Sequence, residues 1–290
     1  MMKRSITILF LFCFCVSAFG QLKMFGQLPS GQYAEGLVFI WRGIEAGNVV
    51  DESFYRNHGT ITGATWVGNG LSYNGTTDTV EIGTAIGKPS KATIIVRFAV
   101  NDWGNTGLVV ESADNGGSNT TWGIRCQDAT NNLEYWVSTG AANQRWLAGT
   151  GEWDSTEFPA GQFNTIAFTH DGSNLYYYKN GVQKNTTAQS TANSGSPTGL
   201  RIGKLGTLAN WTINGIIEYV FIYDRALSAT EIAALYINPD LPMQQEPIWQ
   251  LFSPAAPAAG QVILITKAEQ DYGLMLPWLM SEWLYPNAIQ

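Results

Sequence analysis

The sequence predicts an all-β protein, a two-sheet antiparallel jelly-roll sandwich with one short helix after the closing strand and a C-terminal extension. Between residues 36 and 223, short apolar or alternating runs are separated by Gly, Asn, Asp and Ser clusters, with no sustained helical period. In the same region Asn180-Gly181 joins two such runs, and this pair suits a type I′ hairpin turn because both residues tolerate positive φ. Short strands at regular spacing are typical of sandwiches and barrels.

The N-terminus of the 290-residue chain has the pattern of a secretory signal peptide over residues 1–20. It opens with Met1-Met2-Lys3-Arg4, continues with an apolar run over residues 6–16, and ends in small residues. The apolar run is too short to span a bilayer. We therefore expect cleavage before Gln21, a secreted or cell-surface protein, and a mature N-terminal segment over residues 21–35.

The charge of the chain indicates which classes of partner it can bind. Loss of Lys3 and Arg4 moves the formal charge of the chain from −7 to −9. Nucleic acid and anionic lipid bind proteins with clustered Lys and Arg, so neither is an expected partner of this acidic chain. Polysaccharide or a glycoconjugate suits this acidic, aromatic-rich chain better.

Cys126 is the one cysteine left after cleavage, which excludes an intrachain disulfide, and its alternating context predicts a small core residue.

Apolar or alternating runs predict the strands in chain order. We expect them at residues 37–41, 59–62, 71–73, 79–82, 92–100, 107–112, 121–126, 133–139, 164–170, 174–179, 200–202 and 216–223. A helix follows the last of them. Ser228 is its expected N-cap, with Glu231 completing a capping box, and Leu227 and Ile232 are spaced as a hydrophobic staple.

The wording of residues 214–236 resembles the closing strand and helix of bacterial LamG-like domains, in the concanavalin A-like lectin/glucanase group, which typically read G-x-I-D-E-V-x-I-Y-x-R-A-L-S-x-x-E-I. Residues 73–83 and 163–182 are similar to the family's F-D-G-x-x-D-Y-V-x-I and W-x-x-V-A-x-T-x-D-G-x-x-x-x-Y-x-N-G. Two positions depart from the pattern, since Glu218 stands where the family has Asp and Tyr219 where it has Glu. The resemblance implies a LamG-type jelly roll.

The implied domain spans residues 36–237, and the composition changes after it. Asn238-Pro239 ends the helix, and residues 238–290 form a proline-rich linker followed by an apolar tail. The tail is too short for a transmembrane helix, so we expect a docking or assembly segment for a protein partner. Packing of the tail on the sandwich is the alternative. The stretch QEPIWQLFSPAA at residues 245–256 is similar to C-terminal wording in phage-associated proteins.

One acidic motif has catalytic spacing. Glu152, Asp154 and Glu157 match the E-x-D-x-x-E pattern of family 16 glycoside hydrolases, which share the fold that the resemblance implies. Retaining hydrolysis needs two carboxyl groups about 5 to 5.5 Å apart, which a bulged strand supplies. Here glycines precede the motif and Pro159 follows it, so the context indicates a loop and favours a protein without catalysis.

The loop at residues 51–59 resembles the family loop D-x-S-x-x-x-N-x-G, which in many relatives helps to hold a structural ion together with the acid on the closing strand. Calcium prefers carboxylate, amide and backbone oxygens. The resemblance implies a structural Ca2+ held by Asp51, Asn57 and Glu218. Simple turn formation by Asp51 and Asn57 is the alternative.

Alternation in two neighbouring runs places Arg125, Glu134 and Trp136 on one face and apolar residues on the other. If the apolar face is the core, an exposed indole lies between charged groups, as stacking on a sugar ring requires. The inverted face assignment is the alternative. Further tryptophans in Gly/Asn-rich or polar segments are expected to rim this site: Trp103, Trp146 and Trp211.

Together these patterns predict an exported, non-catalytic carbohydrate-binding or adhesion module that recognises a glycan or a cell surface. Two alternatives stay open. One is an endo-glycosidase of the family 16 type that uses Glu152 and Glu157, and the other is a phage-like structural surface protein.

Overall fold

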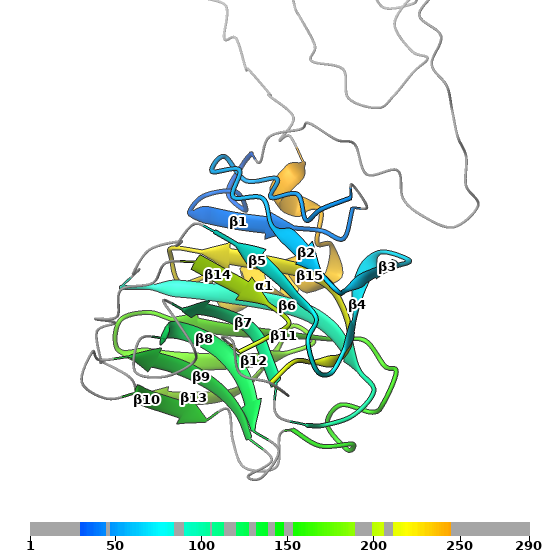
Figure 1. Cartoon of the computed structure of the whole chain (residues 1–290). Coiled ribbons are helices and arrows are strands. Elements are labelled where there is room, and N and C mark those ends of the chain that lie inside the picture. The colour runs from blue at the N-terminus through cyan, green and yellow to red at the C-terminus, as the bar shows by residue number, and fades with distance from the viewer. Residues whose placement is uncertain are drawn as a thin grey trace, which may run out of the picture. The chain divides into compact units, whose positions relative to one another are not determined.

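The computed structural model describes residues 30–44, 47–83, 90–104, 106–112, 120–127, 132–138, 143–147, 153–188, 199–205 and 211–244, and these residues form mainly strands (Figure 1). The strands are β1 Leu37–Trp41, β2 Thr60–Thr62, β3 Thr65–Val67, β4 Gly70–Asn74, β5 Thr79–Ile82, β6 Ala92–Val100, β7 Thr106–Ser112, β8 Thr120–Gln127, β9 Asn132–Ser138, β10 Asn143–Leu147, β11 Asn164–His170, β12 Asn174–Lys179, β13 Val182–Ala188, β14 Gly199–Ile202 and β15 Asn214–Tyr223. Helix α1 covers Ala229–Ile237, and a 3-10 turn covers Leu241–Met243. Within these ranges no helix is long and apolar enough to cross a membrane.

The strands pair into two antiparallel sheets. Sheet I has the order β13-β12-β11-β6-β15-β4-β3, with β1 paired to β15 beside this path, and sheet II has the order β10-β9-β8-β7-β14-β5-β2. The strand order in each sheet differs from the order along the chain, so strands from distant parts of the sequence pair with one another. This arrangement confirms the predicted all-β, two-sheet sandwich.

The centre of sheet I is apolar on both faces because β15 is a nearly continuous apolar run. Ile217 and Val220 lie in the main core between the sheets, and Phe221 and Tyr223 belong to a second apolar cluster on the other side. A bulge between Ile217 and Tyr219 keeps both sets in place where β15 pairs with β6. A strand buried on both faces needs a cover on each side.

The main core holds the large side chains of both sheets, among them Trp41, Phe98, Trp122 and Phe168. Cys126 is fully buried there, which confirms its prediction as a core residue, and burial raises the pKa of its thiol well above the usual value. A buried neutral thiol is unreactive, so Cys126 has a packing role.

Helix α1 covers the second cluster, on the outer side of sheet I. The predicted capping box is confirmed: the Glu231 backbone N–H donates to Ser228 Oγ, and the Ser228 backbone N–H donates to Glu231 Oε2. The staple residues Leu227 and Ile232 are both buried in this cluster. The helix ends at Ile237 with Asn238 as its C-cap.

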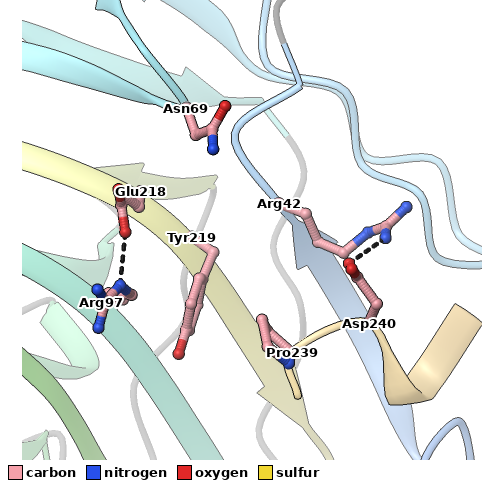
Figure 2. Close-up of a pocket in the computed structure, with 7 residues that line it drawn as sticks. All are labelled: Arg42, Asn69, Arg97, Glu218, Tyr219, Pro239 and Asp240. Carbon is pink, nitrogen blue, oxygen red and sulfur yellow. Dashed lines mark hydrogen bonds and ion pairs between the residues drawn. The ribbon is translucent and has the colours of Figure 1, made fainter. Parts of the chain in front are cut away.

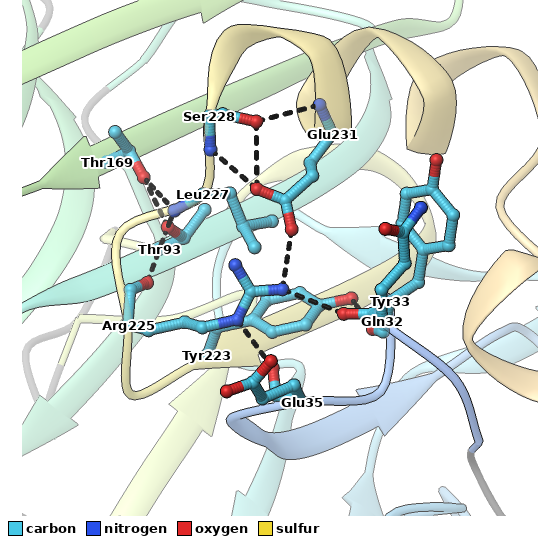
Figure 3. A network of polar contacts seen from close by, with 10 residues as sticks. All are labelled: Gln32, Tyr33, Glu35, Thr93, Thr169, Tyr223, Arg225, Leu227, Ser228 and Glu231. Carbon is cyan, nitrogen blue, oxygen red and sulfur yellow. Dashed lines mark hydrogen bonds and ion pairs between the residues drawn. The ribbon is translucent and has the colours of Figure 1, made fainter.

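Arg225 ties the start of the described chain to the closing segment (Figure 3). Its guanidinium donates to the backbone oxygens of Glu35 (2.7 Å) and Gln32 (3.0 Å) and to the Glu231 carboxylate (2.6 Å). The Tyr223 hydroxyl donates to a further backbone oxygen of the same segment. The Arg-Ala-Leu-Ser motif therefore has a structural basis, because Arg225 joins the end of β15 and the start of α1 to the N-terminal segment.

Candidate functional site

The predicted sugar platform lies on β8 and β9, where the structure describes the surroundings of some of its residues. Ile124 and Leu133 lie in the core, as expected. Arg125 and Glu134 lie on the opposite face, yet they are only 5% and 2% exposed and form an ion pair at 2.7 Å. Their polar groups serve each other under a cover from other parts of the chain, so they are not an open binding surface.

Trp211 forms part of that cover. Its ring lies 5.6 Å from the Arg125 guanidinium carbon, so the structure brings together three of the predicted ligand-binding residues. Trp136 pairs with Gly123 of β8 and with Arg145 of β10 in the ladder. Trp146 lies in β10. The side chains of Trp136 and Trp146 lie outside the described part of the structure, so their role stays a prediction.

Trp103 has a structural position away from this cluster. Its indole N–H donates to the Phe158 backbone oxygen at 3.1 Å, and its ring packs against the main core. The fully buried Trp153 in turn donates to the Trp103 backbone oxygen at 3.1 Å. These bonds fasten the segment around residue 153 to the segment that follows β6.

The acidic motif lies in a turn before β11, as its context indicated, although Glu152 falls outside the described residues. Asp154 Oδ1 accepts hydrogen bonds from the backbone N–H groups of Thr156 (2.8 Å) and Glu157 (3.0 Å). The Glu157 carboxylate forms an ion pair with Lys179 at 2.7 Å. Both described acids therefore have structural partners.

The residues of the predicted calcium site have separate partners. The buried Asp51 carboxylate accepts hydrogen bonds from the backbone N–H groups of Ile40 and Asn57, and the Glu218 carboxylate pairs with Arg97. The described residues contain no group of three His, Cys, Asp or Glu side chains arranged for a metal. Calcium binding by Asp51, Asn57 and Glu218 stays a prediction that a chelator titration would test.

A pocket of about 270 Å³ opens beside Glu218, between the outer side of sheet I and the end of α1 (Figure 2). We call it the Arg97 pocket. Two ion pairs lie on its two sides in this view, with aromatic and apolar side chains between them. Its lining residues come from β6 and β15, from the position after β1, from the β3–β4 turn and from the segment after α1: Arg42, Asn69, Arg97, Glu218, Tyr219, Pro239 and Asp240.

Arg42 anchors one side of the Arg97 pocket. Its guanidinium donates two hydrogen bonds to the Glu52 carboxylate, at 2.8 and 2.7 Å, and a third to Asp240 at 2.6 Å. Burial alone would lower the pKa of Arg42, but the hydrogen bonds and negative charges of Glu52 and Asp240 raise it. The side chain is therefore a permanent, buried cation that fixes the position of Asp240.

The other side of the pocket keeps unused polar atoms. Arg97 Nε donates to Glu218 Oε2, and the Arg97 guanidinium lies 5.2 Å from the Phe163 ring centroid. In the described part of the chain, the terminal nitrogens of Arg97 and Glu218 Oε1 have no partner, and the same holds for the exposed Asn69 amide. Donors and acceptors therefore face the same hollow.

Sequence reasoning did not find this pocket, although one signal was present. Arg97 is the one charged residue of β6, a strand that is otherwise apolar except for Thr93. Arg42 directly follows the apolar run of β1 in the same way. Asn69 and Asp240 lie in connecting segments and carry no comparable signal.

The comparisons with known proteins agree with this architecture. A family model described as the concanavalin A-like lectin/glucanases superfamily matches residues 74–233. Comparison of the sequence with curated proteins finds no match.

Three solved structures illustrate the similarity of fold. They are Trypanosoma rangeli sialidase (17% identity, TM-score 0.53, 71% of this chain and 33% of that chain), the ligand-binding domain of botulinum neurotoxin serotype D in complex with N-acetylneuraminic acid (10%, 0.54, 70% and 51%), and the binding domain of Paraclostridial Mosquitocidal Protein 1 (19%, 0.55, 71% and 52%). This chain spans from a third to about half of their length, and at these identities the likeness concerns the fold alone. Because the family model matches more than half of its residues, the chain belongs to the concanavalin A-like lectin/glucanase superfamily.

Proposed function

We propose that the protein is an exported, non-catalytic carbohydrate-binding or adhesion module whose Arg97 pocket takes part of a polysaccharide or glycoconjugate. The observation that carries this proposal is the set of unused donors on Arg97 and Asn69 beside the unused acceptor on Glu218. Sugar hydroxyls both donate and accept hydrogen bonds, so they need both kinds of group within one hollow. Pro239 adds an apolar edge for the ring.

The size of the pocket limits the ligand. A volume of about 270 Å³ lies below the roughly 300 to 1,000 Å³ of pockets that enclose drug-sized molecules. The pocket therefore suits one sugar residue, such as a chain end or a branch, better than a long segment. The likeness of fold to a neurotoxin domain in complex with N-acetylneuraminic acid supports a sugar as the ligand class.

Two further features support binding without hydrolysis. Asp154 is engaged by the backbone of its own turn, and Glu157 is paired with Lys179, so neither described acid is held ready beside a second carboxylate. Residues 1–20 direct export in this proposal, and the part of the 238–290 tail that follows the pocket residues Pro239 and Asp240 supplies the contact with a protein partner.

The test uses the chain without residues 1–20 on a glycan array and in a reducing-sugar assay. We expect a retained glycan and no release of reducing sugar. Arg97→Gln removes a charged donor, and hydrogen bonds to charged groups contribute roughly 1.5 to 3 kcal/mol, so binding should weaken at least about tenfold. Arg201→Gln is the matched control, because Arg201 forms an ion pair with Glu81 outside the pocket.

Two results would contradict the proposal. The binding function fails if no glycan is retained, or if Arg97→Gln binds as well as the unchanged protein. The absence of catalysis fails if sugar is released and Glu157→Gln abolishes that release.

A further inference from the structure

The loop at residues 49–59 has a rigid base. The fully buried Asp51 carboxylate accepts hydrogen bonds from the backbone N–H groups of Ile40 (3.0 Å), Ser53 (2.9 Å) and Asn57 (2.8 Å). The Ser53 hydroxyl donates a fourth hydrogen bond to the same carboxylate at 2.8 Å. Strand β1 and both arms of the loop are thus fixed to one buried side chain.

The tip of this loop, Phe54-Tyr55-Arg56, has exposed hydrophobic side chains and a backbone conformation that do not stabilise the fold. Phe54 is 59% exposed and Tyr55 is 62% exposed, although both are large hydrophobic side chains. Arg56 has a φ of 55°, a conformation that costs energy for residues other than glycine. The other non-glycine residue with positive φ in the described chain is Asn180, which the hairpin turn explains. Three successive departures of this kind indicate a use other than folding.

The tip also carries a charged side chain that is available to a ligand. Arg56 takes part in none of the ion pairs among the described residues. The exposed Arg56 directly follows two exposed aromatic residues in the chain, so the tip combines a bidentate donor with flat apolar surfaces. Because the base of the loop is already ordered, a ligand would bind the tip without the entropy cost of ordering the loop.

The geometry points to a second sugar site at the Phe54-Tyr55-Arg56 tip, specific for a sugar that carries a carboxylate. The rings supply stacking surfaces for the apolar face of the sugar, and the Arg56 guanidinium pairs with the carboxylate. This inference rests on the proposed function, since it names a charged class of sugar for the same binding module. Arg42 joins the two sites, because its partners are Glu52 at the base of the loop and Asp240 in the Arg97 pocket.

The negative charge of the whole chain does not oppose this assignment at close range. The net charge of −7 is spread over the chain, and charges further apart than about 8 to 10 Å are largely screened at physiological ionic strength. At the tip, Arg56 is exposed, whereas the acids of the same loop, Asp51 and Glu52, are buried and hydrogen-bonded. Within this loop, the exposed charge available to a bound carboxylate is therefore positive.

The experiment measures binding of sialyllactose and of oligogalacturonate, each against its own methyl ester, to the chain without residues 1–20. The ester keeps the ring and removes the negative charge. We expect at least tenfold tighter binding of one acid than of its ester. Arg56→Gln should abolish this preference, and Arg201→Gln should keep it. Tyr55→Ala should weaken binding of acid and ester alike.

Arg56→Gly separates binding from folding. Glycine adopts positive φ without strain, so this variant should melt at a higher temperature and still lose the preference for the acid. The inference is overturned if the unchanged protein binds acid and ester equally, or if Arg56→Gln keeps the preference. Glycan binding that Arg97→Gln abolishes would in either case leave the proposed function standing, whereas absence of all glycan binding would overturn both.

Discussion

The outer sides of the two sheets are covered in different ways. The outer side of sheet I carries an apolar cluster that includes Ile95 and Phe221, and the helix residues Ile232 and Leu235 bury it. The corresponding side of sheet II carries charged residues, with the Arg125–Glu134 pair buried and the Arg201–Glu81 pair partly exposed. Among the described residues, the outer side of sheet I therefore carries a second hydrophobic cluster, whereas the outer side of sheet II carries ion pairs.

The difference teaches how each sheet tolerates change. An apolar cluster gains free energy from burial and loses it in proportion to the atoms removed. A buried ion pair gains little overall, because desolvation offsets the attraction, but removal of one partner leaves an uncompensated charge. We therefore expect sheet II to be the more sensitive at its buried pair and the less sensitive at its exposed pair.

The largest expected effect is at Glu134. Glu134→Ala removes the carboxylate that pairs with the buried Arg125 guanidinium, which should lower the free energy of unfolding by about 3 to 5 kcal/mol. Glu81→Ala is the matched control, since Glu81 is 54% exposed in its pair with Arg201 and its loss should cost less than about 1 kcal/mol. Urea denaturation of both variants measures the difference. Equal losses would show that burial of the pair is not what distinguishes the two.

The next effect concerns the apolar cover of sheet I. Leu235→Ala removes a buried side chain of α1 and should lower the free energy of unfolding by about 2 to 5 kcal/mol, because the cavity collapses only in part. Ile237→Ala is the matched control on the same helix, where the side chain is 80% exposed. Thermal and urea denaturation should show a large loss for the first variant and almost none for the second. A small loss of unfolding free energy in Leu235→Ala would mean that burial of sheet I by α1 contributes little to stability.

The strands at the middle of each sheet were predictable because burial writes a pattern into the sequence. The expected strand at residues 216–223 is β15, and β6, β11 and β12 begin and end where the apolar runs do. The Asn180-Gly181 turn has positive φ at both residues, as predicted. Capping and staple residues of α1 were equally clear, since their signals are local.

The predicted strands leave out β3 and β10, and β13 was expected only as the second run of the Asn180-Gly181 hairpin, without bounds. Each of the three lies at an end of the strand order of its sheet. Edge strands bury fewer side chains, so their sequences keep little apolar alternation, as in the exposed Val182–Ala188 of β13.

The candidate site was only partly predictable for a related reason. Alternation separated the faces of β8 and β9, but it does not reveal that Trp211, far along the chain, lies over Arg125. The Arg97 pocket likewise depends on residues from Arg42 to Asp240, which only the fold brings together.

The smallest expected effect concerns the polar fastening of α1 over sheet I, and it depends on pH. Burial alone would raise the pKa of Glu231, but hydrogen bonds from Arg225 and Ser228 outweigh burial and lower it. The ionised carboxylate is thus bound more tightly in the folded state, so its contribution is complete above the usual value of 4.5 and is lost as the pH falls through the lowered value.

Glu231→Gln removes this charge, and the unchanged protein should therefore be the more stable of the two at pH 7, by about 1 kcal/mol for a lost cap and a partly exposed ion pair. The difference should shrink as the pH falls from 5 to 3, because protonation removes the same charge from the unchanged protein. Urea denaturation at pH 7, 5, 4 and 3 measures it. A difference that stays constant over this range would show that the helix is held over sheet I by its apolar face and neutral hydrogen bonds alone, and the contrast with the charged outer side of sheet II would then be sharper still.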